Sequence, residues 1–99
     1  MRAPFFSIII PTLNEQDCLP HLLEDISRQS DPSYECIVVD GQSEDLTLRI
    51  IQKFSRTHER FSSAISTKKN VSIQRNLGAS LARGEWLVFL DADSRISKN

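Results

Sequence analysis

Glycine is scarce in this 99-residue sequence, which contains Gly41, Gly78 and Gly84 and no others. The phosphate-binding patterns G-x-G-x-x-G and G-x-x-x-x-G-K-[ST] need closely spaced glycines, and neither can be written with these positions. The absence of both patterns disfavours a dinucleotide-binding dehydrogenase and a P-loop ATPase. A diphosphate bound by this chain must therefore depend on a metal ion rather than on a glycine-rich loop.

Excess charge, cysteine and long apolar runs are scarce as well. The 12 basic and 13 acidic residues leave a net charge of −1, which disfavours a nucleic-acid-binding protein. Cys18 and Cys36 are too few for a disulfide scaffold and lack metal-ligand spacing, so we expect reduced, structural thiols. The longest apolar runs, Phe5–Pro11 and Trp86–Leu90, are far shorter than the roughly 20 residues of a membrane span. These absences predict a cytoplasmic protein without a membrane span in this chain.

Apolar runs and helical periodicities alternate along the sequence. Three runs rich in β-branched or aromatic residues end at a proline or an aspartate, which is typical of strands buried on both faces of a parallel sheet. A fourth run is less apolar and indicates an edge strand or a short strand. Between the runs, apolar residues recur at the spacing of one helix face. The predicted strands are Phe5–Ile10, Cys36–Val39, Phe61–Ser66 and Trp86–Leu90, and the predicted helices cover Cys18–Ile26, Leu46–Phe54 and Ser72–Ala82.

The order β-α-β-α-β-α-β predicts an α/β fold, with a mostly parallel open sheet and helices on both faces. No linker or repeat divides the chain, so we expect one unit. Asp17 is the predicted N-cap of the first helix, and Ser43 or Asp45 that of the second. Gly78 predicts a close approach of the third helix to a neighbouring element, for which the sheet is the candidate, and Gly84 predicts its C-terminal stop.

Acidic side chains follow three of the predicted strands, at the sheet edge where ligands of open parallel sheets bind. Asp91 and Asp93 come directly after the last strand, and two carboxylates so spaced can both reach Mg²⁺ or Mn²⁺. The alternative is a solvated turn with helix-capping aspartates. Asp40 either accepts a hydrogen bond from a base or ribose, or is an N-cap or loop acid. Asp45 is better explained as a helix cap, and Glu15 as a charge favoured by a helix dipole.

Four segments in register resemble the donor-binding half of the family 2 glycosyltransferases, which have the GT-A fold. They are Ser7–Glu15, Val38–Thr47 with a V-D-x-x-S-x-D-x-T pattern, Arg75–Ala79 of an R-N-x-G segment, and Ala82–Glu85 followed by Phe89–Asp93 with D-x-D. Their order and spacing agree along essentially the whole chain. The resemblance implies a Rossmann-like nucleotide-binding half, a nucleotide-diphosphate sugar of the UDP or GDP type, and a divalent metal ion, Mn²⁺ or Mg²⁺.

The same resemblance implies roles for individual residues. Pro11, Thr12, Leu13, Asn14 and Glu15 would line the nucleotide pocket, Asp40 would accept hydrogen bonds from the base, Arg75 would lie near the base or phosphates, Asp91 would contact the ribose or a metal-bound water, and Asp93 would coordinate the metal directly. Gly41 stands where many members have a second aspartate, and Leu13 replaces a common aromatic residue. Neither a second acid nor base stacking is therefore carried over.

The reaction also needs a base to deprotonate the acceptor hydroxyl. The family places that base well beyond D-x-D, whereas this chain ends at Asn99. We therefore expect residues 1–99 to be the donor-binding half of an inverting transferase, with the acceptor-binding half and all catalytic residues absent, and inactive alone. An exposed edge at the last strand would favour a homodimer. The alternatives are an inactive GT-A-like module, a related nucleotidyltransferase and a phospho-receiver module.

Overall fold

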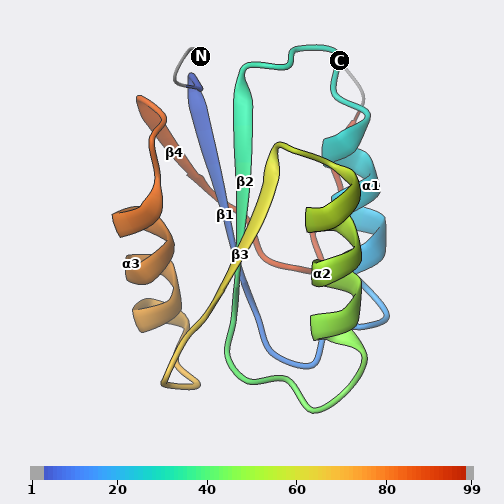
Figure 1. Ribbon diagram of the computed structural model, residues 1–99, viewed down its shortest axis with the longest axis vertical. Coiled ribbons are helices and arrows are strands. Elements are labelled where there is room, and N and C mark those ends of the chain that lie inside the picture. The colour runs from blue at the N-terminus through green and yellow to red at the C-terminus, as the bar shows by residue number, and fades with distance from the viewer. Residues whose placement is uncertain (1–3, 98–99) are drawn as a thin grey trace.

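The computed structural model describes residues 4–97, so both ends of the expected 1–99 unit lie outside it. Strands and helices alternate as predicted (Figure 1), and the α/β fold class is confirmed. The strands are β1 (Phe6–Thr12), β2 (Tyr34–Asp40), β3 (Phe61–Ile65) and β4 (Trp86–Phe89), and the helices are α1 (Leu19–Ser27), α2 (Thr47–Thr57) and α3 (Val71–Leu81). None of the helices within residues 4–97 is long and apolar enough to cross a membrane.

The four strands form one parallel sheet in the order β3-β2-β1-β4. The chain moves outward from β1 to β3 and then crosses back, so the strand order switches between β1 and β4. β1 and β2 are central and buried on both faces, and β3 is an edge strand, as predicted. The prediction that Trp86–Leu90 is a buried strand is wrong. β4 forms the other sheet edge, ends at Phe89, and leaves Trp86 61% exposed.

Two polar pairs fix the register of β1 against β2. Ser7 lies opposite Glu35, and Thr12 lies opposite Asp40. Ser7 Oγ donates to Glu35 Oε2 at 2.6 Å, and Thr12 Oγ1 donates to Asp40 Oδ1 at 2.7 Å. All four residues are buried. A slip by one residue would leave two buried carboxylates without their donors, so these pairs specify the pairing of the strands.

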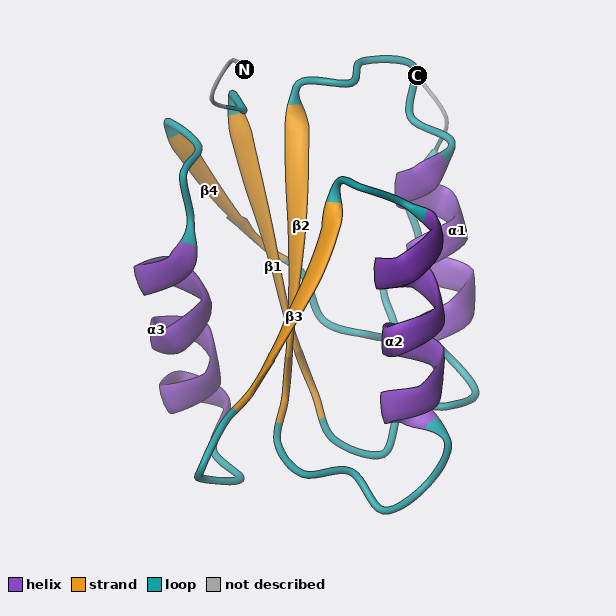
Figure 2. Cartoon of the chain, in the orientation of Figure 1, coloured by secondary structure: helices purple, strands orange, loops and turns teal. Residues whose placement is uncertain are grey.

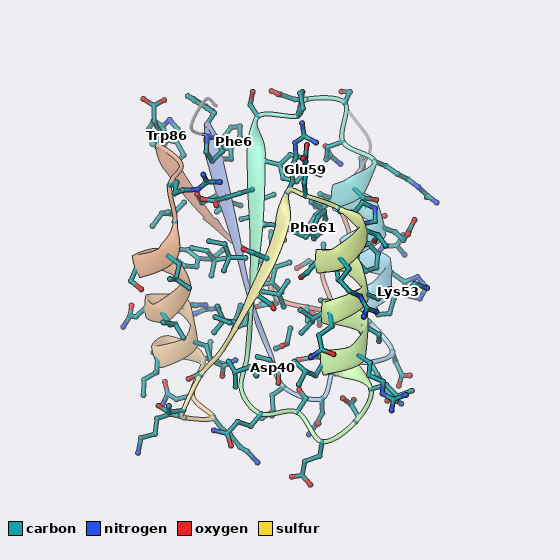
Figure 3. The ribbon with its side chains drawn as sticks, viewed as in Figure 1. Phe6, Asp40, Lys53, Glu59, Phe61 and Trp86 are labelled. Atoms are coloured by element: carbon teal, nitrogen blue, oxygen red, sulfur yellow. The ribbon has the colours of Figure 1, made fainter. Side chains whose placement is uncertain are left out.

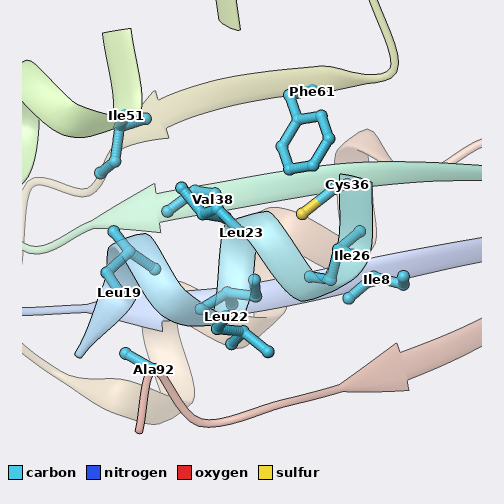
Figure 4. Packing of buried hydrophobic residues seen from close by; sticks show 11 residues of the cluster. Ile8, Leu19, Leu22, Leu23, Ile26, Cys36, Val38, Ile51, Phe61 and Ala92 are labelled. Carbon is cyan, nitrogen blue, oxygen red and sulfur yellow. The ribbon is translucent and has the colours of Figure 1, made fainter. Parts of the chain in front are cut away.

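Helices α1 and α2 cover one face of the sheet and α3 covers the other (Figure 2). The largest buried cluster lies on the α1 and α2 face (Figure 4). Its members are Ile8, Ile10, Leu19, Leu22, Leu23, Ile26, Cys36, Val38, Ile51, Phe61 and Ala92. Ala92 comes from the segment after β4, so that segment is tied to the main core. Both cysteines are free thiols, and burial raises the pKa of Cys36.

Gly78 lies where α3 approaches the sheet most closely, as the sequence predicts. A Cβ at this position would lie 2.5 Å from Ile9 Cγ2 and 3.2 Å from Val39 Cγ2. Both neighbours are on the central strands and have no exposed surface. The glycine costs helix propensity, and this cost is offset by the close contact between the helix and the sheet.

Gly84 does not stop α3, so that prediction is wrong. The helix ends at Leu81, and Ala82 is already extended, with φ −71° and ψ 141°. Among the described residues no glycine has a positive φ. Gly84 is required instead by a close approach to β1, because a Cβ there would lie 2.6 Å from Ser7 Oγ. Its amide donates to the same Oγ at 2.8 Å.

The first helix lacks the predicted side-chain cap. α1 is preceded by Cys18 rather than by an Asp17 cap, and no side chain accepts a hydrogen bond at that end. The Glu15 carbonyl accepts from the Cys18 amide at 3.2 Å instead. The second helix does use Asp45, whose Oδ1 accepts from the amide of Thr47, the first residue of α2, at 2.9 Å. The N-cap of α2 is nevertheless Leu46, which makes no side-chain cap bond, so the prediction that Ser43 or Asp45 caps this helix is wrong, and Asp45 holds the first helical amide from one residue further upstream.

Glu35 is expected to stabilise the fold at neutral pH and to lose this effect below about pH 4.5. Burial raises the pKa of Glu35, but hydrogen bonds from Ser7 and the Arg83 amide, with the Arg83 charge, outweigh burial and hold it below 4.5. A carboxyl group with a lowered folded pKa stabilises above its unfolded pKa, and this stabilisation is lost as the pH falls through the folded pKa. Urea unfolding of wild type and Glu35→Gln should therefore converge as the pH falls. A gap that stays constant down to about pH 3 contradicts this assignment.

Candidate functional site

The carboxyl ends of the parallel strands meet at one edge of the sheet, where Figure 3 labels Asp40. Phe6 and Trp86 mark the opposite edge in the same view. The loops that follow β1, β2 and β4 carry most of the site residues predicted from the sequence. Because the strand order also switches beside β1, this edge is where a parallel sheet offers a crevice to a ligand.

Asp40 has no exposed surface, and its carboxylate is held by neighbouring residues. Oδ1 accepts from Thr12 Oγ1 at 2.7 Å and from Ser43 Oγ at 2.6 Å, and Oδ2 accepts from Ser43 N at 2.7 Å. Three hydrogen bonds compensate the burial of this group. A carboxylate has about four lone-pair directions, so one direction at Oδ2 is not used by these three bonds. Asp40 thus joins the end of β1 to the loop after β2.

Further hydrogen bonds join the loop after β1 to the loop after β2. Asn14 N donates to Ser43 Oγ at 2.8 Å, and Asn14 Oδ1 accepts from Glu44 N at 2.8 Å. Glu15 N donates to Thr47 Oγ1 at 2.7 Å. Asn14 has a positive φ of 55°, a conformation that asparagine tolerates better than most residues. The polar residues of the V-D-x-x-S-x-D-x-T pattern therefore hold the two loops against each other.

The five loop residues predicted to line a nucleotide pocket differ in accessibility. Pro11 and Thr12 are buried, Leu13 and Asn14 are exposed, and Glu15 is half-buried. Leu13 is 37% exposed, which places an apolar side chain at the surface of this edge. Only the last three residues therefore present side chains toward a ligand.

Gln74 is a residue of this edge that sequence reasoning missed. It is 2% exposed, and its Nε2 donates to the carbonyls of Thr12 and Val39, both at 2.9 Å. Gly41 leaves room for it, since a Cβ there would lie 2.9 Å from Gln74 Oε1. Gln74 thus fastens α3 to the ends of β1 and β2, one position before Arg75. The signal in the sequence was an amide on the helix face that also carries Gly78.

The D-x-D motif forms a turn with its middle residue in the core. Ala92 is 3% exposed, whereas Asp91 and Asp93 are both exposed. The Ser94 amide donates to the Asp91 carbonyl at 3.0 Å. The buried methyl group anchors the turn, and both carboxylates remain accessible from solvent.

Arg75 connects α3 to this turn. Its Nη2 donates to Asp91 Oδ1 at 3.2 Å, with both side chains partly exposed. Its Nε is buried and has no hydrogen-bond partner among residues 4–97. A buried donor without an acceptor costs about 1–3 kcal/mol, and a ligand could reach this N–H only if the side chain moved. The R-N-x-G segment and the D-x-D turn therefore meet at the same edge.

The acids of the loops after β2 and β4 raise the pKa of Glu15 in the loop after β1. Burial raises the pKa of Glu15 above 4.5, and the charge of Asp93 raises it further. A backbone hydrogen bond from Leu13 lowers it, while the charges of Asp45 and Asp91 add to the increase. The charges of Asp45, Asp91 and Asp93 thus act on Glu15, and a cation beside it would relieve that repulsion.

The donor set of the turn is compatible with a hard divalent cation. Over the described part of the chain, no group of three or more His, Cys, Asp or Glu side chains could hold a metal ion. Mg²⁺ is commonly bound by one or two carboxylates, with waters and substrate phosphates as the remaining ligands. Two exposed carboxylates and the repulsion felt by Glu15 fit Mg²⁺ or Mn²⁺ in that arrangement. They do not fit a structural Zn²⁺ site, which needs four protein ligands.

Comparisons with known proteins agree with this geometry. The sequence profile of Glycosyl transferase family 2 matches residues 7–99. A PGL/p-HBAD biosynthesis glycosyltransferase of Mycobacterium bovis (strain BCG / Pasteur 1173P2) is 44% identical over 97 residues, which cover 97% of this chain and 38% of that protein. S. aureus TarS 1–349 in complex with UDP-GlcNAc matches with a TM-score of 0.85 and 30% identity, over 95% of this chain and 28% of that chain. Mannosyltransferase PcManGT from Pyrobaculum calidifontis, in complex with GDP-Man and Mn²⁺, gives a TM-score of 0.81 at 28% identity, over 96% and 29% of the two chains.

The chain therefore spans less than half the length of the relatives it matches, 38% in the mycobacterial protein. The resemblance expected from the four sequence segments is confirmed by the profile and by these relatives. The parallel sheet and its flanking helices are shared with GT-A glycosyltransferases. The chain belongs to glycosyl transferase family 2.

Proposed function

We propose that this chain binds the nucleotide-diphosphate sugar and the divalent metal ion of an inverting glycosyltransferase. The observation that carries the proposal is the contact between Arg75 and Asp91, which joins the R-N-x-G helix to the D-x-D turn at the carboxyl edge of the sheet. Two structural neighbours were solved with UDP-GlcNAc and with GDP-Man, which supports a UDP- or GDP-type donor.

In this proposal the turn and α3 bind the diphosphate together. Asp93 is exposed and would coordinate Mn²⁺ or Mg²⁺ directly, while Asp91, held by Arg75, would contact the ribose or a metal-bound water. The partly exposed guanidinium of Arg75 would donate to the phosphates or the base. A metal ion bound here would neutralise the negative charge that develops on the leaving diphosphate.

The two joined loops bind the nucleoside. Leu13, Asn14 and Glu15 present their side chains at the pocket wall, and the buried Pro11 and Thr12 support it from behind. Asp40 would accept a hydrogen bond from the base through the remaining lone pair of Oδ2. Because Asp40 has no exposed surface in this structure, that contact requires the loop around Ser43 to move aside. The bonds from Thr12 and Ser43 keep its carboxylate in a single orientation.

The proposal covers donor binding and assigns no catalytic base. Sugar transfer passes through an oxocarbenium-like state and needs a base for the acceptor hydroxyl. We therefore propose that residues 1–99 tested alone bind the donor without measurable transfer.

We place the protein in the cytoplasm, or peripherally on the cytoplasmic membrane face if the natural chain is longer.

We also propose that copies of this chain pair through β4. Trp86, Leu87 and Phe89 are 61%, 43% and 44% exposed on this edge strand. An exposed strand edge with apolar side chains is a template for pairing with another strand. Analytical ultracentrifugation of wild type and Leu87→Lys tests this pairing. The wild type is expected to be a dimer and Leu87→Lys a monomer, and a monomeric wild type would contradict the proposal.

Calorimetry with UDP and GDP tests donor binding. Nucleotide is expected to bind with Mn²⁺ or Mg²⁺ and not in EDTA. Asp93→Ala is expected to weaken metal-dependent binding by at least about 10–100-fold. A loss of that size is typical when a group that only orients a metal ligand is removed, and Asp93 is the proposed ligand itself. Glu59→Ala removes the same charge at the opposite edge of the sheet (Figure 3) and should leave binding unchanged.

Two outcomes would contradict the proposal. A folded sample, judged by circular dichroism, that binds no nucleotide at millimolar concentration would favour an inert module with the same fold. If Asp93→Ala kept the full metal dependence, the ion would be bound by other residues, and the assignment of Asp93 as the direct ligand would be wrong.

A further inference from the structure

One buried carboxylate on α1 fastens the segment that follows the D-x-D turn. Asp25 is 9% exposed. Its Oδ2 accepts from Arg95 Nε at 2.7 Å and from Ile96 N at 3.1 Å, and its Oδ1 accepts from Arg95 Nη2 at 3.1 Å. The bonds from Arg95 and then from the Ile96 amide lower the pKa of Asp25 to about 2, so the group is charged at neutral pH. Two parallel bonds from a guanidinium and one from an amide form a charge-assisted clamp.

The same segment is held at further points on the α1 side of the sheet. Gln29, just after α1, donates through Nε2 to the Ser97 carbonyl at 2.9 Å. Ile96 packs against the main core, and Ala92 lies inside it (Figure 4). Residues 90–97 form no helix or strand, and they cross from β4 to the α1 side in Figure 1. These contacts, rather than regular secondary structure, therefore fix the path of the segment.

Asp93 lies between two anchors. On its upstream side Ala92 is buried in the core, and on its downstream side Asp25 holds Arg95 and Ile96. Each anchor is within three residues of Asp93, so both constrain the backbone at this position. The hydrogen bonds of Asp25 go to Arg95 and Ile96, so Asp25 influences Asp93 through the main chain.

We propose that Asp25 is a positioning residue of the donor site, which holds the backbone after Asp93 so that this carboxylate is oriented toward the metal ion. The inference rests on the proposed function. Groups that orient a metal ligand without touching the metal change metal affinity by about 10–100-fold. Asp25 acts one step further away, so we expect the lower end of that range, about tenfold.

A second buried acid provides a matched control. Glu35 pairs with Arg83 with side-chain exposures of 9% and 63%, and Asp25 pairs with Arg95 with exposures of 9% and 64%. Glu35 also accepts from a backbone amide, Arg83 N, at 2.6 Å. It lies near the amino end of β2, whereas the turn follows the carboxyl end of β4. Glu35→Gln therefore removes an equivalent buried charge without touching the turn.

The test compares wild type, Asp25→Asn and Glu35→Gln as full 99-residue chains. Asparagine keeps the size of the side chain and one acceptor oxygen, but its NH₂ group faces a donor of Arg95, so the parallel pair of bonds and their charge assistance are lost. Mn²⁺ affinity in saturating UDP, measured from the EPR signal of free Mn²⁺, is expected to fall about tenfold in Asp25→Asn. It should stay within about twofold of wild type in Glu35→Gln, although both variants lose thermal stability.

NMR of the metal-free protein tests the positioning separately from metal binding. In Asp25→Asn the Ile96 amide is expected to exchange faster, and the resonances of residues 91–94 are expected to shift. Glu35→Gln should change neither. If Asp25→Asn does not fold, Arg95→Lys removes the parallel bonds from the exposed side and is expected to act in the same direction.

The outcomes separate the two proposals. Equal losses of Mn²⁺ affinity in Asp25→Asn and Glu35→Gln, or an unchanged turn in Asp25→Asn, would overturn the positioning role while the proposed function stands. A folded wild type that binds no Mn²⁺ in the presence of UDP would overturn the proposed function and, with it, the role of Asp25 toward the metal.

Discussion

Replacing Asp40 with alanine is expected to lower the free energy of unfolding by about 3 kcal/mol, because it leaves buried donors without their acceptor. The carboxylate accepts from Thr12 Oγ1 and from Ser43 Oγ and N, at 2.6–2.7 Å. Each buried donor left unsatisfied costs about 1–3 kcal/mol, and hydroxyl groups recover part of this by turning to other acceptors. Urea unfolding followed by circular dichroism measures the loss.

Asp40→Asn is the matched control for this prediction. Its carbonyl oxygen can accept from the Ser43 amide, and its NH₂ group can donate to the hydroxyls of Thr12 and Ser43. We therefore expect a smaller loss, about 1 kcal/mol. An alanine variant within about 0.5 kcal/mol of wild type would show that these bonds do not hold the loops. A folded Asp40→Asn that no longer binds nucleotide would support the proposed contact with the base.

The element order could be predicted from the sequence because its signals are local. The run Phe5–Ile10 is apolar apart from Ser7, the run Cys36–Val39 is apolar throughout, and the central strands are buried on both faces. Gly78 marks the close approach of α3 within its own helical pattern. The acids of the D-x-D turn could be placed at the ligand edge because parallel strands bring their carboxyl ends together.

The polar pairs could not be predicted, because they depend on register. Ser7 and Glu35 meet only when β1 and β2 pair in one alignment, and the same alignment brings Thr12 to Asp40. Nothing in the sequence around Asp40 indicates that its carboxylate is already satisfied by protein donors. Gln74 was missed for the same reason, since its acceptors are main-chain carbonyls on two other elements.

Two errors arose from features that composition does not record. Trp86–Leu90 is as apolar as a central strand, and its composition does not say that β4 is at the edge. Gly84 follows a helix, as a C-terminal glycine commonly does, but it is selected by contact with Ser7 rather than by a positive φ. In both cases the deciding neighbour lies on β1, far away in the sequence.

Gly78→Val is expected to lower the free energy of unfolding by about 3 kcal/mol, the upper end of the usual cost of overpacking a core. The new Cβ would lie 2.5 Å from Ile9 Cγ2 and 3.2 Å from Val39 Cγ2. These side chains are fully buried on central strands and cannot move aside. α3 must therefore lift from the sheet, which stretches the Gln74 bonds to the Thr12 and Val39 carbonyls. Nucleotide affinity is expected to fall together with stability, because Arg75 follows Gln74 on the same helix.

Ser80→Val places the same side chain on the exposed face of α3 and should change stability by no more than about 0.5 kcal/mol. Gly78→Ala is expected to fall between the two, since about 1 kcal/mol of helix propensity offsets part of its overlap with Ile9. Urea unfolding ranks the three variants, and calorimetry with UDP and Mn²⁺ follows the site. A Gly78→Val variant as stable as Ser80→Val would mean that α3 lies further from β1 and β2 than the 2.5 Å contact requires. Loss of stability with unchanged nucleotide affinity would mean that Arg75 keeps its place without the Gln74 anchor.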